Sequence, residues 1–124
     1  MKKAYYAHCV AIYGSKQEAR DIATIEALGF ECVNPNTPEV AAAYQDYKQR
    51  NPHDPMQYFS RFSNECDVVI FRALPEGTIP AGIEKEIGWF IAFDKPVLEL
   101  PSGMTRRRLT LEQTREYLKE VGQR

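Results

Sequence analysis

The chain has few of the residues that build disulfide frameworks and metal sites. It contains three cysteines and two histidines in 124 residues. Cys9, Cys32 and Cys66 are odd in number and widely spaced, and each lies next to or within an apolar segment, which favours buried free thiols over disulfides. The scattered histidines and cysteines form no recognisable ligand set. We therefore expect neither a metal ion nor another cofactor.

Long hydrophobic runs and an excess of one charge are also missing. No stretch approaches the roughly 18 uninterrupted apolar residues that a membrane span needs. The start, Met1-Lys2-Lys3-Ala4, enters a strand pattern rather than a signal peptide, so we expect a cytoplasmic protein without a membrane partner. The 17 acidic and 16 basic residues give a formal net charge of -1, which provides no global attraction for a nucleic acid polymer. A small molecule held by local contacts is the expected partner.

The sequence does contain an alternation of strand-like and helix-like segments, within the length of one domain spanning residues 1–124. Strands are predicted at 3–10, 30–33, 67–71 and 95–100, and helices begin near Ser15, Thr37, Asp54, Pro80 and Thr110. This alternation predicts a three-layer α/β fold of the Rossmann-like or flavodoxin-like kind, with a four- to five-stranded, mainly parallel sheet. Ligands of such sheets bind outside the carboxyl ends of the strands.

Glu86, on the predicted helix from Pro80 to Asp94, is a carboxylate that we expect to be partly buried and close to the carboxyl ends of the strands. At 100° per residue, Glu86 shares a column with Gly82 and Phe90, so its carboxylate borders the buried stripe, and Gly82 leaves space beside it. A carboxylate among aromatic side chains needs a hydrogen-bond partner, a shifted pKa, or both. Candidate partners are the phenols and the cation on neighbouring strands: Tyr5, Tyr6 and Arg72. The alternative is a helix-start residue that pairs with the helix dipole and an arginine.

A second candidate feature is the start of the first predicted helix. Gly14 and Ser15 lead into a helix N-terminus whose free N–H groups could accept a phosphate, with help from Lys16, Arg72 and Thr78. The alternative is a capped helix with no ligand.

Other polar residues keep two interpretations. His8 ends the first predicted strand and could donate a proton to a leaving group, or it could be a satisfied structural histidine. Asp67 opens a buried predicted strand, where a structural role, holding the preceding turn through backbone hydrogen bonds, is favoured over a catalytic one. The basic triplet 106–108 could contact a phosphate or a neighbouring subunit, although a run of three charges is usually solvated.

Four segments together carry a resemblance to a known family. They are, in chain order, Ala4-Tyr5-Tyr6-Ala7-His8, Cys66-Asp67-Val68-Val69-Ile70-Phe71, Gly82-Ile83-Glu84-Lys85-Glu86-Ile87-Gly88 and Asp94-Lys95-Pro96-Val97. In order and spacing they resemble the nucleoside 2-deoxyribosyltransferase superfamily, which includes N-glycosidases that act on nucleoside 5'-monophosphates. The resemblance covers residues 3 to about 100.

The resemblance implies an enzyme whose nucleophile is Glu86, oriented by a hydrogen bond from Tyr5. The carboxylate would attack the anomeric carbon, expel the base and form a glycosyl ester that water or a second base resolves. It also implies a homo-oligomer, a dimer or higher. Two positions depart from the family pattern, because Phe59 and Pro80 stand where the family has polar residues. The resemblance therefore implies cleavage or transfer of the N-glycosidic bond of a nucleoside or nucleoside 5'-monophosphate, with hydrolysis of a monophosphate favoured over base exchange. The two departures favour the alternative, a non-catalytic nucleotide-binding or sensing module.

Overall fold

Four parallel strands form the centre of the molecule. The computed structural model describes residues 1–101 and 111–120. In the described residues β1 (Lys3–Ala7), β2 (Glu31–Val33), β3 (Val68–Phe71) and β4 (Val97–Glu99) lie in the order β2-β1-β3-β4, and each neighbouring pair is parallel. The α/β fold predicted from the alternating segments is confirmed.

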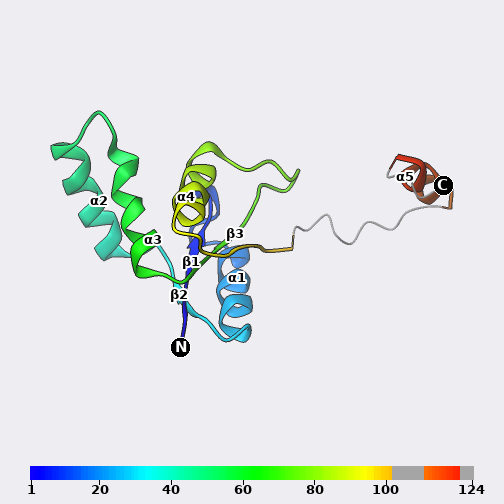
Figure 1. The fold of residues 1–124 in the computed structure, drawn as a ribbon, viewed down its shortest axis with the longest axis horizontal. Helices are drawn as coiled ribbons and strands as arrows, with labels where there is room; N and C mark the ends of the chain where they lie inside the picture. Colours follow the sequence, from blue (N-terminus) through cyan, green and yellow to red (C-terminus); the bar gives the residue numbers. More distant parts are fainter. Residues whose placement is uncertain (102–110, 121–124) are drawn as a thin grey trace.

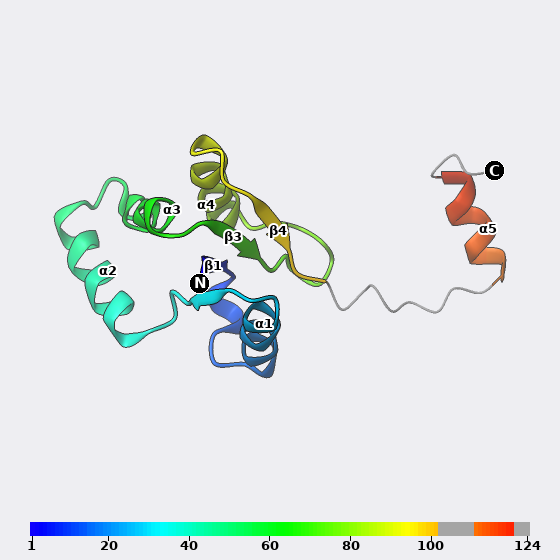
Figure 2. The ribbon, with the colours of Figure 1, turned by 60° about the horizontal axis from the view of Figure 1, so that its bottom comes forward.

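Helices cover both faces of this sheet (Figures 1 and 2). On one face lies α1 (Lys16–Ala27), and on the other lie α3 (Arg61–Glu65) and α4 (Ala81–Ala92), with the 3-10 helix η2 (Pro55–Ser60) leading into α3; α2 (Pro38–Arg50) packs outside η2 on that same side. The final described helix is α5 (Leu111–Glu120). The structure is therefore three-layered, as predicted, with one helix on one face of the sheet and several on the other.

The alternation of side chains along the strands divides the core in two. Tyr5 and Ala7 of β1 point to the side of α3 and α4, where they join the buried aromatic residues Phe62 and Phe90. Tyr6, between them in sequence, points to the other side and packs with the residues beneath α1, including Ile25. Neighbouring tyrosines on one strand thus enter different cores.

The first strand is shorter than predicted. We expected it to run to residue 10, but β1 ends at Ala7, and residues Val10–Ile12 form a short 3-10 helix, η1. Ala7 is paired with Phe71, the last residue of β3, and the N–H of Arg72 bonds to the Ala7 carbonyl. Within residues 1–101, neither neighbouring strand continues beyond that point, so the residues after Ala7 have no backbone partner in the sheet and turn away.

The helix starts follow local capping chemistry. Ser15 Oγ accepts the Glu18 N–H of α1 at 3.1 Å, and Thr37 Oγ1 accepts the Val40 N–H of α2 at 3.1 Å. The segment Ser15-Lys16-Gln17-Glu18 has the sequence of a capping box, but only half of the box forms at α1, because the Glu18 carboxylate bonds to the N–H of Gly14 rather than to that of Ser15. The basic triplet 106–108 and the predicted cap at position 110 lie outside the described residues.

The order of the strands marks where a ligand can enter. From β1 the chain crosses to β2 on one side, and from β2 it crosses back over β1 to β3 on the other. The crossovers leave β1 and β3 in opposite directions, which opens a crevice at their carboxyl ends. Among the described helices, none has both the length and the apolar character needed to cross a membrane.

Candidate active site

Glu86 is buried in α4 and hydrogen-bonded to the strand next to it. Its side chain accepts a hydrogen bond from the Tyr5 hydroxyl of β1 at Oε2, and the residue is only 7% exposed. Of the three partners that the sequence offered, the structure places Tyr5 at the carboxylate. Tyr6 and Arg72 both contact Asp21 of α1 instead. Glu86 is thus held from the core side by a phenol.

Burial changes the acidity of this pair. Removal from water raises the pKa of Glu86 to about 7, and the hydrogen bond from Tyr5 acts in the opposite direction. Burial and the neighbouring Glu86 also raise the pKa of Tyr5 well above its usual value, so its hydroxyl keeps its proton. With a pKa near neutrality, Glu86 can reach both its acid and its carboxylate form close to pH 7. A group with this balance can act as a nucleophile or exchange a proton.

A pocket of about 210 Å³ opens beside Glu86. Its lining is mostly apolar and comes from the end of β1, from η2 and from the start of α4: Tyr5, His8, Cys9, Val10, Tyr13, Met56, Phe59, Pro80, Gly82, Ile83 and Glu86. Gly82 lies one turn before Glu86, and a methyl group at that position would lie 3.5 Å from Met56 Cε. Gly82 thus lines the pocket, and the space directly beside it is bounded by Met56.

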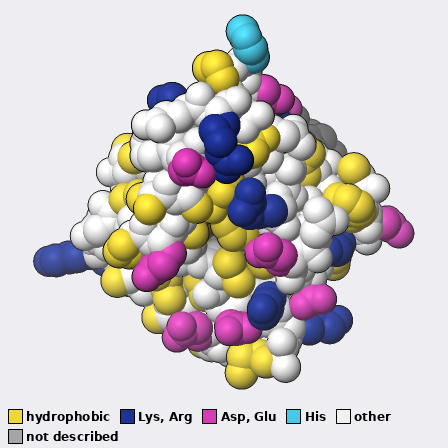
Figure 3. All heavy atoms as spheres, turned by 90° about the vertical axis from the view of Figure 1, so that its left-hand side faces the viewer, with side chains coloured by type: hydrophobic (Ala, Val, Ile, Leu, Met, Phe, Trp, Pro, Cys, Tyr) yellow, Lys and Arg dark blue, Asp and Glu magenta, His cyan; other side chains and the backbone are white. Residues whose placement is uncertain are grey.

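A second, larger pocket of about 360 Å³ adjoins the first. The two share four lining residues, Val10, Tyr13, Met56 and Phe59. The outer pocket adds residues from the turn before α2 and from α2 itself, among them the polar Asn36, Thr37 and Gln45. No lysine or arginine lines either pocket in the described part of the chain. Figure 3 shows the face of the molecule on the α2 side, where charges of both signs are interspersed among hydrophobic side chains.

His8 is buried at the same edge, but both of its ring nitrogens have partners. Nδ1 lies 3.0 Å from the carbonyl oxygen of Tyr6, and Nε2 lies 2.8 Å from Glu18 Oε2. The ring also stacks on Tyr6, with ring centres 3.7 Å apart, and lies against Tyr13. This arrangement is that of a satisfied histidine, the second interpretation that the sequence allowed, and it leaves no free ring nitrogen for a leaving group.

Several of the residues predicted to hold a phosphate are hydrogen-bonded to other groups of the protein. The Gly14 N–H is engaged by Glu18 Oε1 at 3.1 Å, and Ser15 caps α1 while its hydroxyl donates to the Ile12 carbonyl. Thr78 is exposed in the loop after β3, where its carbonyl accepts the Leu74 N–H. None of Gly14, Ser15 and Thr78 lines the two pockets at Glu86.

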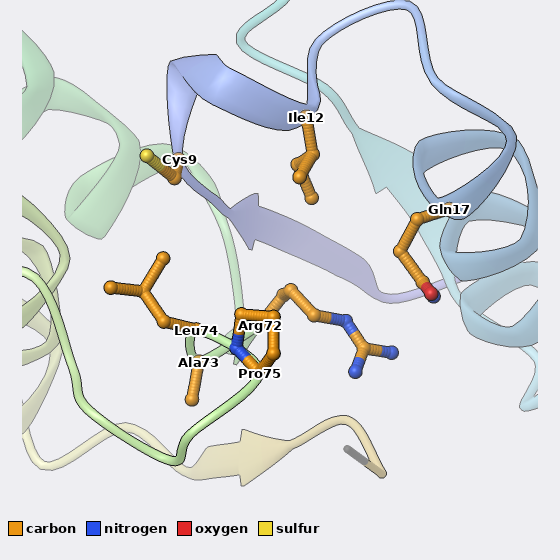
Figure 4. Close-up of a pocket in the computed structure, with 7 residues that line it drawn as sticks. All are labelled: Cys9, Ile12, Gln17, Arg72, Ala73, Leu74 and Pro75. Carbon is orange, nitrogen blue, oxygen red and sulfur yellow. The ribbon is translucent and has the colours of Figure 1, made fainter. Parts of the chain in front are cut away.

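Arg72 is committed to a different ion pair. Figure 4 shows its side chain extended toward Gln17 at the start of α1, in a pocket of about 160 Å³. Its guanidinium donates to both carboxylate oxygens of Asp21, at 3.0 and 2.6 Å, and to the Pro101 carbonyl. The hydrogen bond and charge of Asp21 raise the pKa of Arg72, against the effect of burial. Arg72 therefore joins β3 to α1 on the side of the sheet away from Glu86.

Several residues of the site carry no signal that we recognised in the sequence. Tyr13 and Met56 line both pockets, although neither belongs to a motif. Glu18 and Asn36 are joined by hydrogen bonds of 3.2 and 3.1 Å. Glu18 belongs to the capping pattern that begins at Ser15, whereas Asn36 comes into place only through the crossover that follows β2.

The described residues hold no group of three or more histidine, cysteine, aspartate or glutamate side chains placed to bind a metal ion. All three cysteines are free thiols, and Cys66 is buried while Cys9 and Cys32 are partly exposed. Burial raises the pKa of Cys66 to about 11 and that of Cys32 to about 12, so these two thiols stay protonated.

Comparison of the chain with protein families and with curated proteins finds no match. Glu86 and Tyr5 are nevertheless paired as the sequence resemblance implies, at the carboxyl edge of a parallel sheet. The two departures from the family pattern also lie at this site, because Phe59 and Pro80 both line the Glu86 pocket.

Proposed function

We propose that this protein cleaves or transfers the N-glycosidic bond of a nucleoside or a nucleoside 5'-monophosphate, with Glu86 as the nucleophile. The observation that carries the proposal is a buried carboxylate, held by the Tyr5 hydroxyl, that lines an otherwise largely apolar pocket beside the strand crevice. A nucleophile of this kind needs a fixed direction and a site from which water can be displaced.

The reaction that fits this geometry proceeds in two displacements. Glu86 attacks the anomeric carbon of the sugar, the bond from that carbon to the base nitrogen breaks, and its electron pair leaves with the base. The hydroxyl of Tyr5 holds Oε2, which leaves Oε1 for attack. Water or a second base then displaces the carboxylate from the glycosyl ester. The departing base takes its proton from solvent, since the ring nitrogens of His8 are occupied.

Glu86 is the one carboxylate in the described lining of its pocket. Glycosidases that retain or invert configuration both use a pair of carboxyl groups, one of which acts as acid for the leaving group. The lining supplies the nucleophile of the double displacement but no second carboxyl group, so the acid for the leaving base has to be water.

The charge of the lining favours neutral substrates. A phosphate held in either pocket would find no lysine or arginine among the described lining residues. A planar base would instead lie among the rings of Tyr13, Tyr44 and Phe59 in the outer pocket, with the side-chain amides of Asn36 and Gln45 available to its polar edge. Among the two substrate classes, unphosphorylated nucleosides are therefore the better fit.

The alternative function, a nucleotide-binding or sensing module without turnover, is favoured by one specific feature. Phe59 and Pro80 make the pocket apolar at two positions where the family has polar side chains. Such a lining offers contact area for a ligand but little acid–base chemistry. In that case the protein would bind a nucleoside and release it unchanged.

The test is a chromatographic assay of purified protein with a panel of nucleosides and 5'-monophosphates. Wild-type protein is expected to release free base, and Glu86→Gln is expected to lower the rate at least about 1,000-fold, because the nucleophile is lost. Glu84→Gln, on the exposed side of the same helix, is the matched control and should retain wild-type activity.

Activity that survives in Glu86→Gln would overturn the role of this residue. Saturable binding without release of base, in wild-type protein, would move the assignment to the sensing module. Light scattering on the same samples tests the expected dimer or higher oligomer.

A further inference from the structure

Glu18 joins three separate segments that form the walls of the two pockets. Its carboxylate accepts hydrogen bonds from the Gly14 N–H, the Asn36 side-chain amide and the His8 ring. His8 follows β1, Gly14 precedes α1, and Asn36 precedes α2. His8 lines the Glu86 pocket and Asn36 lines the outer pocket, while Tyr13, next to Gly14, lines both.

The partners of His8 define the charge of its ring. A backbone carbonyl can only accept a hydrogen bond, so Nδ1 must donate to Tyr6. Glu18 receives three further hydrogen bonds from the Gly14 and Asn36 donors, and this set fits an ionised carboxylate that only accepts, with Nε2 as the donor of the fourth bond. A histidine that donates from both nitrogens carries a positive charge.

The ionisation of Glu18 agrees with this assignment. Burial acts to raise its pKa, but the hydrogen bonds from His8, Gly14 and Asn36 outweigh burial and hold the pKa below its usual value. The side chains of His8 and Glu18 are 0% and 9% exposed, so water supplies little compensation to either charge. Two charges in such a place stabilise each other only if both are fully hydrogen-bonded.

We propose that His8 is held as an imidazolium by Glu18, and that this buried ion pair positions the pocket wall formed by residues 8–14 and Asn36. This role of the His8–Glu18 pair does not require that Glu86 act as a nucleophile, because the pair affects the shape of the cavity and not the reaction in it. Both residues are positioning residues, and neither needs to contact the substrate.

Other charged groups around the ring are compatible with a cation. From β1, the Tyr6 ring stacks on the imidazole, nearly parallel at 4°. From the loop, Tyr13 presents a phenol that stays neutral, because burial raises its pKa to about 12. Beyond Tyr6, the charge of Asp21 is balanced by Arg72. The carboxylate that faces the ring directly is therefore that of Glu18.

Nitrogen-15 NMR of the histidine rings tests the charge directly in the wild-type protein. At pH 7 we expect two ring N–H signals from His8. The other histidine of the chain, His53, is exposed in the loop before η2 and provides the reference for a ring in contact with solvent. A single ring nitrogen bearing a proton in His8 would overturn the proposal without any variant being made.

Two substitutions then separate charge from position. Glu18→Gln keeps the shape but removes the charge, so at pH 7 His8 should retain its proton on Nδ1, facing the Tyr6 carbonyl, and lose the one on Nε2. Glu18→Ala should also remove the hydrogen bonds that hold the wall segment in place. The Gly14 amide then loses its hydrogen bond to a charged group, so we expect its hydrogen exchange to become at least about tenfold faster.

Glu26→Gln and Glu26→Ala, on the exposed side of the same helix, are the matched controls and should change neither signal. Unchanged His8 protonation in Glu18→Gln would contradict the ion pair. Unchanged exchange at Gly14 in Glu18→Ala would contradict the positioning role.

Discussion

At Glu86, burial and hydrogen bonding act on one carboxyl group in opposite directions. Burial disfavours the ionised form, and the Tyr5 hydroxyl favours it. The result is a pKa of about 7, where a small change in pH changes the fraction of the nucleophilic form. The surroundings of this one residue therefore influence both the reactivity of the proposed site and the pH dependence of folding stability.

Glu86 should make the protein less stable as the pH rises. Its pKa is about 7 when folded and 4.5 in the absence of burial, so between these values the folded state binds the extra proton. The stability linked to that proton is present below pH 4.5 and is lost as the pH passes 7, a change of about 3 kcal/mol at most.

Urea unfolding at pH 4.5 and pH 8.5 measures this effect. The difference in unfolding free energy between the two pH values should be smaller in Glu86→Gln than in the wild-type protein by about that amount, whereas Glu84→Gln should behave like wild type. An equal pH dependence in wild type and Glu86→Gln would show that Glu86 is not titrating in this range.

Tyr5→Phe tests the other half of the pair. Removing the hydroxyl takes away the hydrogen bond that lowers the pKa of Glu86, so the pKa should move above 7. Carbon-13 NMR of the Glu86 carboxyl group follows this titration. Tyr6→Phe, on the same strand but facing the other core, should leave the titration unchanged. A Glu86 titration that is the same in Tyr5→Phe as in wild type would contradict the role of the hydroxyl.

At the scale of the helix and the turn, backbone angles decide which glycines are replaceable. Gly14 has φ of +74°, which strains any residue with a Cβ, although a Cβ there would contact nothing. Gly88 lies within α4, where glycine is a poor helix former, and a Cβ there would also meet nothing within 4 Å.

The two glycines should therefore respond in opposite directions. We expect Gly14→Ala to lower the free energy of unfolding by about 1 kcal/mol, and Gly88→Ala to raise it by about 0.5–1 kcal/mol. Chemical denaturation of the two variants provides the measurement. Since neither methyl group meets a neighbour, a common sign for both changes would show that factors other than backbone conformation decide the outcome.

At the scale of the whole molecule, Lys95 links two crossover units. It follows α4, and its Nζ donates to the carbonyls of Ser63 and Cys66 at 2.5 and 2.8 Å, at the end of α3. This explains one part of the Asp94-Lys95-Pro96-Val97 segment in structural terms. The segment brings a cation to carbonyl groups that the end of α3 leaves without helical partners.

Lys95→Met should therefore weaken the fold as a whole. Loss of hydrogen bonds to a charged group is expected to lower the unfolding free energy by about 2 kcal/mol. Lys85→Met is the control, because Lys85 makes a 3.9 Å ion pair with Asp54 between two half-exposed side chains, and such pairs contribute well under about 1 kcal/mol. Equal midpoints of thermal unfolding in the two variants would contradict the linking role.

The sequence alone determined the local structure and the fold class. The alternating strand and helix patterns, the caps at Ser15 and Thr37, and the place of Glu86 beside Gly82 all depend on residues near in the chain. Their periodicity and capping chemistry act over one or two turns, so they can be recognised without knowledge of the rest of the molecule.

Only the tertiary structure decided which distant groups meet. Tyr5 and Glu86 are 81 residues apart, and Arg72 and Asp21 are 51 apart. Adjacent residues of a strand face opposite sides of the sheet. Because α4 lies on one side and α1 on the other, Tyr5 contacts Glu86 of α4, whereas Tyr6 and Arg72 contact Asp21 of α1. The packing of α1 against the end of β1 likewise brings Glu18 to His8. A hydrogen bond requires proximity in space, whereas the sequence specifies only proximity along the chain.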